Sequence, residues 1–227
     1  MNKHGGKIIE ASQLYSRAKH RVLGEILQDA ELKTEHAWAS IHASSKDLLM
    51  TYESEGFVVS VNGSGTLDVD HHQCILAREL SEYIVSRGGI ILNGGRSSGI
   101  MKVSSEAAPK HSIGIVFSEV AKEANEHGKK IVVQDPHSRI ELLATAAPIV
   151  VVFRGGLGTL MVLMRSIAYL NNRRFHPEQP AQLIFVSNYW IGLLTTMMNL
   201  GALPKEFVQE IYFFERVDQI IKFLPSI

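Results

Sequence analysis

Short apolar, β-branched runs alternate with helical patterns along most of this chain, and this alternation constrains the fold more than any other feature. The runs lie at residues 57–61, 89–92, 113–117, 130–133, 149–153, 183–186 and, more weakly, 211–214. Helical patterns lie between them, near residues 71–87, 99–108, 119–127, 138–147, 159–172, 189–200 and 217–224. Strands that alternate with helices are typical of βαβ units on a parallel sheet. Fully apolar runs such as Ile149-Val150-Val151-Val152 favour strands that are covered on both faces. The sequence therefore predicts an α/β fold with a doubly wound parallel sheet, Rossmann-like, in three α/β/α layers.

The first 52 residues have a different hydrophobic pattern from the rest of the chain. Apolar residues recur there at helical spacing, and no glycine or proline interrupts the chain between Gly24 and Gly56. We therefore expect an N-terminal helical extension over residues 1–52, which packs on the main domain or on a partner subunit. The Rossmann-like domain would then span residues 53–227.

Composition excludes several classes of partner. The 23 lysines and arginines balance the 23 acidic residues, so the chain offers no strong field to long polyanions, and we expect no nucleic acid partner. The single cysteine, Cys74, excludes an intramolecular disulfide and fits a reducing compartment. The N-terminus is polar and no stretch approaches the length of a membrane span. We therefore predict a cytoplasmic protein without a membrane partner.

Three predicted strands end in small-residue loops. These loops are Asn62-Gly63-Ser64-Gly65-Thr66, Asn93-Gly94-Gly95-Arg96-Ser97-Ser98-Gly99 and Arg154-Gly155-Gly156-Leu157-Gly158-Thr159. One such loop is as often a tight turn, but parallel strands bring all three to the same edge of the sheet. Glycines there let backbone N–H groups approach a phosphate, and a following helix adds the positive end of its dipole. The loops therefore predict a cleft for a phosphorylated ligand.

The loops match neither G-x-G-x-x-G nor G-x-x-x-x-G-K-[ST], which disfavours dinucleotide cofactors and triphosphate hydrolysis, and we expect no cofactor. Arg139 is the basic residue most favoured to join the cleft, since it opens the helix after residues 130–133, with Ser138 as the expected N-cap. Arg96 and Arg154 lie inside glycine loops and are also expected to contact phosphate. The alternative for each arginine is a solvated surface position.

One cluster of potential metal ligands, Asp68-Val69-Asp70-His71-His72, precedes a predicted helix. Adjacent residues on a helix point in different directions, and acidic residues are common in a first helical turn. We therefore interpret this cluster as a helix start and predict no metal site.

Taken together, these residues resemble the Lonely Guy (LOG) family of Rossmann-like nucleoside monophosphate phosphoribohydrolases. The family signature P-G-G-x-G-T-x-x-E is matched from Arg154 to Thr159, and an upstream G-G-G-x-x-G-L-M is matched from Asn93 to Met101. The resemblance covers residues 57 to about 225. It implies that Gly155, Gly156, Gly158 and Thr159 bind the phosphate. The three loops themselves add Gly63, Ser64, Gly94, Gly95, Arg96 and Arg154 as expected phosphate or substrate contacts. The resemblance further implies a catalytic role for Arg139, a nucleoside 5′-monophosphate or sugar phosphate as substrate, and a homodimer.

The chain departs from the family at the residues that carry chemistry. Val162 occupies the position of the family glutamate, Ile140 that of the lysine after the arginine, and Arg154 that of the leading proline. A carboxylate can stabilise the oxocarbenium-like state of glycosidic cleavage and orient water, and valine can do neither. Glu119, Glu123, Glu126 and Glu141 could in principle replace it, although Glu141 would point to a different helix face from Arg139.

Two functions therefore stay open. The resemblance implies an enzyme that hydrolyses the N-glycosidic bond of its nucleotide, which yields the free base and ribose 5-phosphate. The residues favour a catalytically impaired nucleotide-binding or sensor protein, because Val162 removes the acid while the glycine loops are kept.

Overall fold

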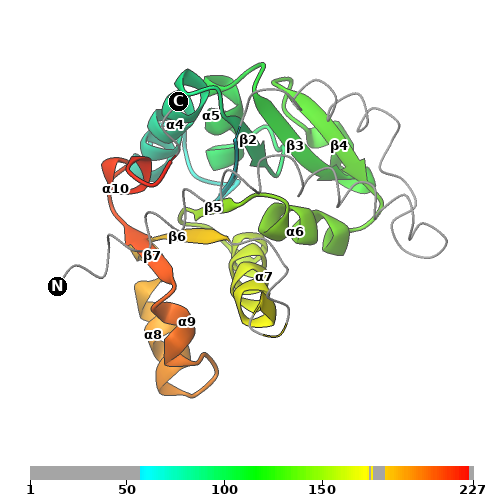
Figure 1. Cartoon of the computed structure of the whole chain (residues 1–227). Coiled ribbons are helices and arrows are strands. Elements are labelled where there is room, and N and C mark those ends of the chain that lie inside the picture. Colours follow the sequence, from blue (N-terminus) through cyan, green and yellow to red (C-terminus); the bar gives the residue numbers. More distant parts are fainter. Residues whose placement is uncertain (1–56, 174, 176–181, 225–227) are drawn as a thin grey trace.

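The computed structural model describes residues 57–173, 175 and 182–224 (Figure 1). The predicted helical extension at residues 1–52 lies outside these residues. Within them, seven parallel strands form one sheet in the order β4-β3-β2-β1-β5-β6-β7. The strands are β1 (Val58–Asn62), β2 (Ile90–Asn93), β3 (Ser112–Phe117), β4 (Lys129–Val133), β5 (Ile149–Val152), β6 (Leu183–Ser187) and β7 (Ile211–Phe214). Each lies within about one residue of its predicted run.

Helices connect the strands. They are α4 (His72–Ser86), α5 (Gly99–Ala107), α6 (Pro136–Thr145), α7 (Leu157–Arg173), α8 (Ile191–Asn199), α9 (Lys205–Val208) and α10 (Asp218–Ile221), with short 3-10 turns η1 (Ser118–Glu123) and η2 (Asn188–Trp190). The doubly wound, Rossmann-like α/β architecture predicted from the sequence is thereby confirmed.

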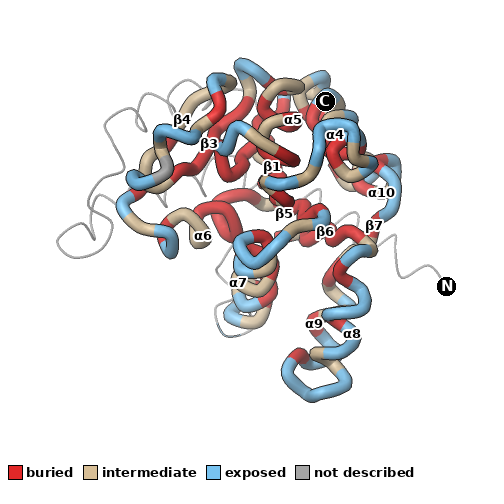
Figure 2. The backbone as a smooth tube through the Cα atoms, turned by 180° about the vertical axis from the view of Figure 1, so that it is seen from behind, coloured by how far each residue is buried: buried red, intermediate tan, exposed pale blue. Residues whose placement is uncertain are grey.

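Alternate residues of the central strands face opposite helical layers, as the two-residue period of a strand requires. Val59 and Val61 of β1 pack with α4, α5 and α10, whereas Val150 and Val152 of β5 pack with α7 and α8. Figure 1 shows α4, α5 and α10 on one side of the sheet and α6 and α7 on the other. The buried strands run between these layers, while α8 and α9 project from the body with exposed surfaces (Figure 2).

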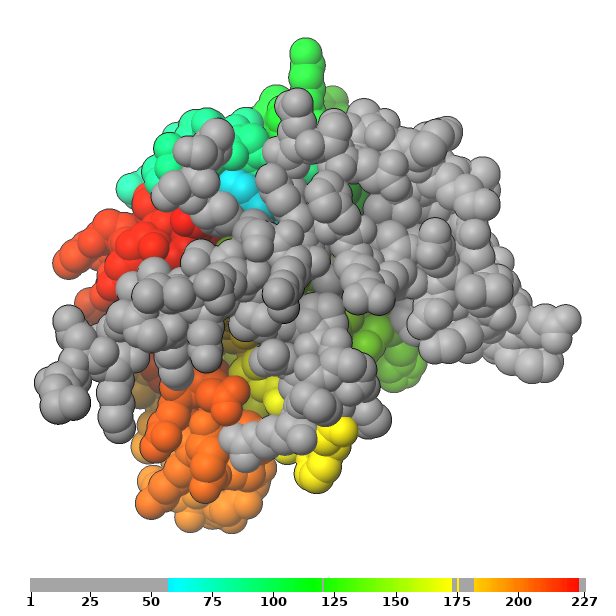
Figure 3. Space-filling model, viewed as in Figure 1, coloured from blue at the N-terminus to red at the C-terminus, as the bar shows by residue number. Residues whose placement is uncertain are grey.

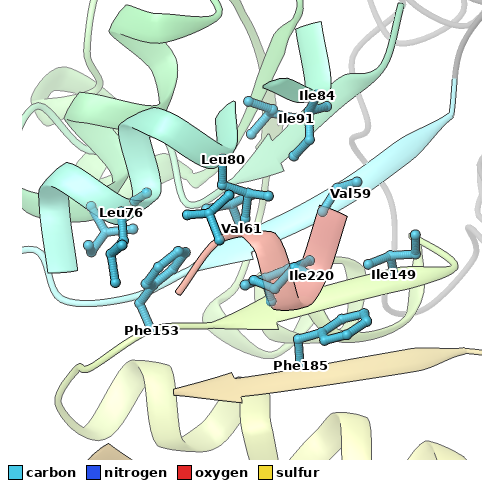
Figure 4. Packing of buried hydrophobic residues seen from close by; sticks show 14 of the residues in the cluster. Val59, Val61, Leu76, Leu80, Ile84, Ile91, Ile149, Phe153, Phe185 and Ile220 are labelled. Carbon is cyan, nitrogen blue, oxygen red and sulfur yellow. The ribbon is translucent and has the colours of Figure 1, made fainter. Parts of the chain in front are cut away.

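The α4 layer is held by one continuous apolar cluster, seen in Figure 4. Leu76 and Leu80 of α4 face β1, β5 and the C-terminal helix α10, whose Ile220 is fully buried. In the space-filling view the red C-terminal segment lies beside α4, at a distance from the orange α8 and α9 (Figure 3). Burial of each such side chain stabilises the fold by about 1.5–3 kcal/mol. This cluster holds the strand ends, and thus the site, in fixed positions.

Three short segments differ from the sequence prediction. The helix expected near residues 119–127 is only the 3-10 turn η1, because Asn125 N donates to Gly95 O at 2.8 Å and so leaves the helical path. The helix α9 was not predicted. The acidic residues Asp68 and Asp70 lie before α4 and not in its first turn, where His71 is the N-cap and its Nδ1 accepts from Gln73 N at 3.1 Å.

None of the described helices is both long enough and apolar enough to span a membrane. Likewise, the described residues contain no group of three or more histidine, cysteine or acidic side chains that could hold a metal ion. Cys74 is fully buried in the α4 cluster, and this burial raises the pKa of its thiol.

Candidate functional site

A cavity of about 200 Å³ lies where the strand order reverses. β1 pairs with β2 on one side and β5 on the other, so the loops after β1 and β5 lead to different sides of the sheet. Such a switch point leaves a crevice at the carboxyl ends of the strands. The residues that line the cavity are Asn62, Gly63, Ser64, Gly65, Thr66, Gly94, Arg96, Met101, Arg139, Leu143, Gly156, Gly158, Thr159 and Val162.

The loop after β1 is fixed against the start of α5. Ile100 N donates to Ser64 O at 2.9 Å, and a Cβ on Gly63 would lie 2.6 Å from Cγ1 of Ile100. Gly99 has a φ of +58°, and a side chain there would meet Ser64 O at 2.1 Å. These close approaches need glycine, and they place the start of α5 beside the cavity wall.

The N-terminus of α7 opens into the cavity. Its first helical hydrogen bond runs from Leu160 N to Gly156 O at 3.0 Å, so the preceding N–H groups have no partner within the helix. Gly156 and Gly158 face open space, and no acidic residue lies in the first turn of α7. A Cβ on Gly155 would meet Oγ1 of Thr159 at 2.1 Å, so this glycine admits the Thr159 hydroxyl. N–H groups without a helical partner, together with the helix dipole, give this end of α7 the chemistry that favours an anion.

Arg139 reaches the cavity from α6. Its Nε donates to Ile115 O at 2.8 Å and its Nη2 to Gly94 O at 2.9 Å. Burial lowers the pKa of the Arg139 guanidinium, and the positive charge of Arg96 lowers it further. In the described part of the chain no carboxylate pairs with Arg139, and no hydrogen bond of Nη1 is found among these residues. Gly94 permits this arrangement, because a Cβ there would lie 2.2 Å from Nη2.

The start of α6 differs from the prediction that Ser138 is its N-cap. Asp135 is the N-cap, and Pro136 occupies the first helical position. The Asp135 carboxylate accepts from His137 N at 2.8 Å and from Ser138 N at 2.9 Å. A hydrogen bond from the Ser138 hydroxyl is the main cause that lowers the pKa of Asp135. This cap fixes the first turn of α6, which carries Arg139.

The structure brings most of the predicted site residues together around the cavity. Gly63, Ser64, Gly94, Arg96, Arg139, Gly156, Gly158 and Thr159 all line it. Gly95 and Gly155 are not among the lining residues. Gly95 has a φ of +69° and lies against Gly114. Arg96 also pairs with Glu123, at 2.6 Å between Nη2 and Oε2.

Arg154 points away from the cavity. Its guanidinium carbon lies 5.2 Å from the centre of the Tyr189 ring, and its Nη1 lies 3.4 Å from Nε2 of His71. Its backbone N donates to Oε1 of Gln73 at 3.1 Å. The structure therefore places the Arg154 side chain at the rim, over the ends of β5 and β6.

The described residues that line the cavity include no carboxylate. Val162, at the position where the LOG signature has glutamate, is 3% exposed and faces the cavity beside Leu143. Glu141 forms a two-point ion pair with Arg165 of α7, in which Arg165 Nη2 donates to Oε1 at 2.6 Å. The expectation that Glu141 points away from Arg139 agrees with this pairing. The cavity thus offers donors and positive charge without a general base of the carboxylate type.

Sequence reasoning did not name five of the lining residues as site residues: Gly65, Thr66, Met101, Leu143 and Asn62. Asn62 is the buried polar residue among them. It ends β1, and its side chain is only 5% exposed. Its Nδ2 donates to Oγ of Ser60 at 2.9 Å, and the Ser60 hydroxyl donates to Leu143 O at 2.6 Å. The sequence did contain a signal for it, because a polar residue that ends an otherwise apolar strand is a candidate site residue.

The chain from residue 56 to residue 174, more than half of its length, matches the model of the SLOG cluster4 family. The chain belongs to the SLOG cluster4 family. The resemblance to the Lonely Guy family is thereby confirmed at the level of the wider SLOG group. No curated protein matches this SLOG cluster4 chain.

Solved structures share the fold of this SLOG cluster4 protein. The molybdenum cofactor binding protein from the phototrophic bacterium Rippkaea orientalis is 18% identical, with a TM-score of 0.59 over 74% of this chain and 95% of that one. The molybdenum cofactor carrier protein from Chlamydomonas reinhardtii is 20% identical, with a TM-score of 0.54 over 74% and 94%. At these identities the likeness concerns the fold.

Proposed function

We propose that this SLOG cluster4 protein binds a phosphomonoester ligand, a nucleoside 5′-monophosphate or a sugar phosphate, without hydrolysing its N-glycosidic bond. The observation that carries this proposal is the composition of the cavity wall. Two arginines and the open N-terminus of α7 face the cavity, whereas its described lining contains no carboxylate. The wall therefore suits a dianion and lacks the group that would activate water.

The phosphate would lie at the start of α7. There it would accept hydrogen bonds from the backbone N–H groups near Gly156 and Gly158 and from the Thr159 hydroxyl. Nη1 of Arg139 supplies a charge-assisted donor from the facing wall. Oxygens of one phosphate can use several such donors at once.

Hydrolysis would need a group that orients water and stabilises positive charge on the sugar. Loss of a catalytic acid or base alone typically lowers the rate by about 10² to 10⁴. Val162 cannot supply that group, and Glu141 is engaged by Arg165. The names of the two structural neighbours, a binding protein and a carrier protein, are consistent with a fold that holds a ligand.

Calorimetry tests binding, and chromatography tests hydrolysis. The probes are methyl phosphate, ribose 5-phosphate, adenosine 5′-monophosphate and cytidine 5′-monophosphate, with adenosine as the unphosphorylated control. We expect binding of the phosphorylated probes, no binding of adenosine, and no release of free base. Absence of binding by every phosphorylated probe would refute the proposal. Base release above background would replace it with the phosphoribohydrolase that the family resemblance implies.

We further propose that the protein is a homodimer in the cytoplasm and binds neither nucleic acid nor membranes. The equal numbers of basic and acidic residues support the second part. Light scattering after size exclusion tests the first part, and the full chain and a chain that begins at residue 53 should be compared. A monomeric full chain would refute the dimer.

A further inference from the structure

Asn62 has a side chain whose orientation is fixed by its neighbours. The Ser60 hydroxyl has one proton, and it is donated to Leu143 O at 2.6 Å. The Asn62 atom that lies 2.9 Å from Ser60 Oγ must therefore be a donor, so it is Nδ2 and not Oδ1. The carboxamide cannot be flipped without the loss of this hydrogen bond. Oδ1 consequently has one defined direction.

Oδ1 of Asn62 accepts no hydrogen bond from any residue that the structure describes. Among the described residues, the side-chain polar atoms that are fully buried and lack a hydrogen-bond partner are Arg87 Nε, Ser112 Oγ and Gln182 Oε1. Asn62 Oδ1 is not one of them, so it is not fully buried. Oδ1 is therefore open to the cavity that Asn62 lines, although the residue as a whole is only 5% exposed. A buried amide oxygen normally has a partner, and an open one at a cavity wall is available to a ligand.

Oδ1 differs in kind from the groups opposite it. Arg139, Arg96 and the start of α7 donate hydrogen bonds, while Asn62 Oδ1 is a neutral acceptor. A phosphate dianion has no proton to donate to an acceptor, so this part of the wall suits a different group of the same ligand. A hydroxyl or amino group is the matching donor. The neutral amide also adds no negative charge that would repel a phosphate.

We infer that Asn62 binds the ligand directly and selects a phosphomonoester that also carries a hydrogen-bond donor, such as a sugar hydroxyl. This inference rests on the proposed function and assigns its second contact. The neighbouring Val162 and Leu143 are apolar and cannot accept that proton. Asn62 thus occupies the role of a specificity-determining residue, distinct from the phosphate site at α7.

A comparison of two probes tests the inference. Methyl phosphate offers only the anion, whereas ribose 5-phosphate adds hydroxyl groups, and calorimetry gives both dissociation constants. In Asn62→Ala we expect ribose 5-phosphate to bind about five- to tenfold more weakly, the effect of one lost hydrogen bond. Methyl phosphate should change by less than about twofold, because its donors are elsewhere. Asn188→Ala is the matched control, since Asn188 also lies at the carboxyl end of a strand, directly after β6, but donates to Glu215 and does not line the cavity.

An unchanged affinity of Asn62→Ala for ribose 5-phosphate would overturn the inference while the proposed function stands. Failure of both probes to bind the wild-type protein would overturn the two together. Thermal unfolding shows whether the variant is folded. If Asn62→Ala does not fold, Asn62→Asp keeps the shape and places a negative charge at the wall. Methyl phosphate should then bind about tenfold more weakly, and an unchanged affinity would place residue 62 away from the ligand.

Discussion

Replacement of Arg139 by leucine tests whether this arginine serves mainly to bind the ligand or mainly to stabilise the fold. The Arg139 guanidinium donates to two backbone carbonyls, Ile115 O and Gly94 O, and the residue lines the cavity. Burial lowers its pKa, which means that the folded protein holds this charge at a cost. A phosphate would compensate the charge. Arg139→Leu should therefore affect binding far more than folding.

The size of each effect can be worked from these contacts. A hydrogen bond to a charged group contributes about 1.5–3 kcal/mol, so the affinity for a phosphomonoester should fall about 10- to 150-fold. The variant also leaves two carbonyls without their guanidinium donor, at about 1–3 kcal/mol each. In the opposite direction, removal of a buried charge that has no carboxylate partner stabilises the folded state by several kcal/mol, because its desolvation penalty disappears. The two terms oppose each other, and we expect the free energy of unfolding to change by less than about 1 kcal/mol.

Calorimetry with adenosine 5′-monophosphate and urea unfolding measure the two quantities on the same protein. Arg154→Leu is the control, because Arg154 stands at the same end of the sheet but contacts Tyr189 and His71 outside the cavity. We expect its affinity to remain within about threefold of the wild type, since its exposed guanidinium contacts Tyr189 and His71 and its charge is screened by solvent. Wild-type affinity in Arg139→Leu would refute the reasoning, as would an equal loss in both variants.

Three further predictions concern other parts of the molecule. Val162→Glu should introduce base release from nucleoside 5′-monophosphates, at least about 10²-fold above Val162→Gln, because the carboxylate supplies the missing base; equal rates in chromatographic assays would show that more of the site has diverged. Asp135→Ala should lower the free energy of unfolding by about 0.5–2 kcal/mol through loss of the α6 cap, and an unchanged urea midpoint would contradict this. Burial raises the pKa of Cys74 above its ordinary 9.0, so the unfolded chain loses this proton first. The thiol's contribution to stability is therefore complete below about pH 9 and declines above it, and Cys74→Ala should flatten that alkaline decline in urea titrations.

The fold was largely predictable because strands buried on both faces appear in the sequence as short, wholly apolar runs. The run Ile149-Val150-Val151-Val152 is the clearest case, and it forms β5 at the centre of the sheet. The short elements were harder. Residues 119–127 have helical composition, but hydrogen bonds from Asn125 to the loop after β2 end the turn early. Such a contact between distant segments has no local sequence signal.

The candidate site was predictable in its backbone and less so in its side chains. Glycine loops at the ends of parallel strands must meet at one edge of the sheet, so Gly63, Gly94 and Gly156 were found. The direction of Arg154 could not be predicted, because it depends on the position of Tyr189 after β6. Asn62 was missed because its role depends on a hydrogen-bond chain through Ser60 to α6.

The close approach of Gly94 to Arg139 has a consequence for how relatives of this protein are compared. A Cβ at position 94 would lie 2.2 Å from Nη2 of Arg139 and 2.6 Å from the sulfur of Met101, so a larger residue there would require both side-chain ends to move. Arg139 would then lose its hydrogen bond to Gly94 O and its present direction in the cavity. A homologue that has an arginine at position 139 and a side chain at position 94 is therefore expected to hold its guanidinium in a different place.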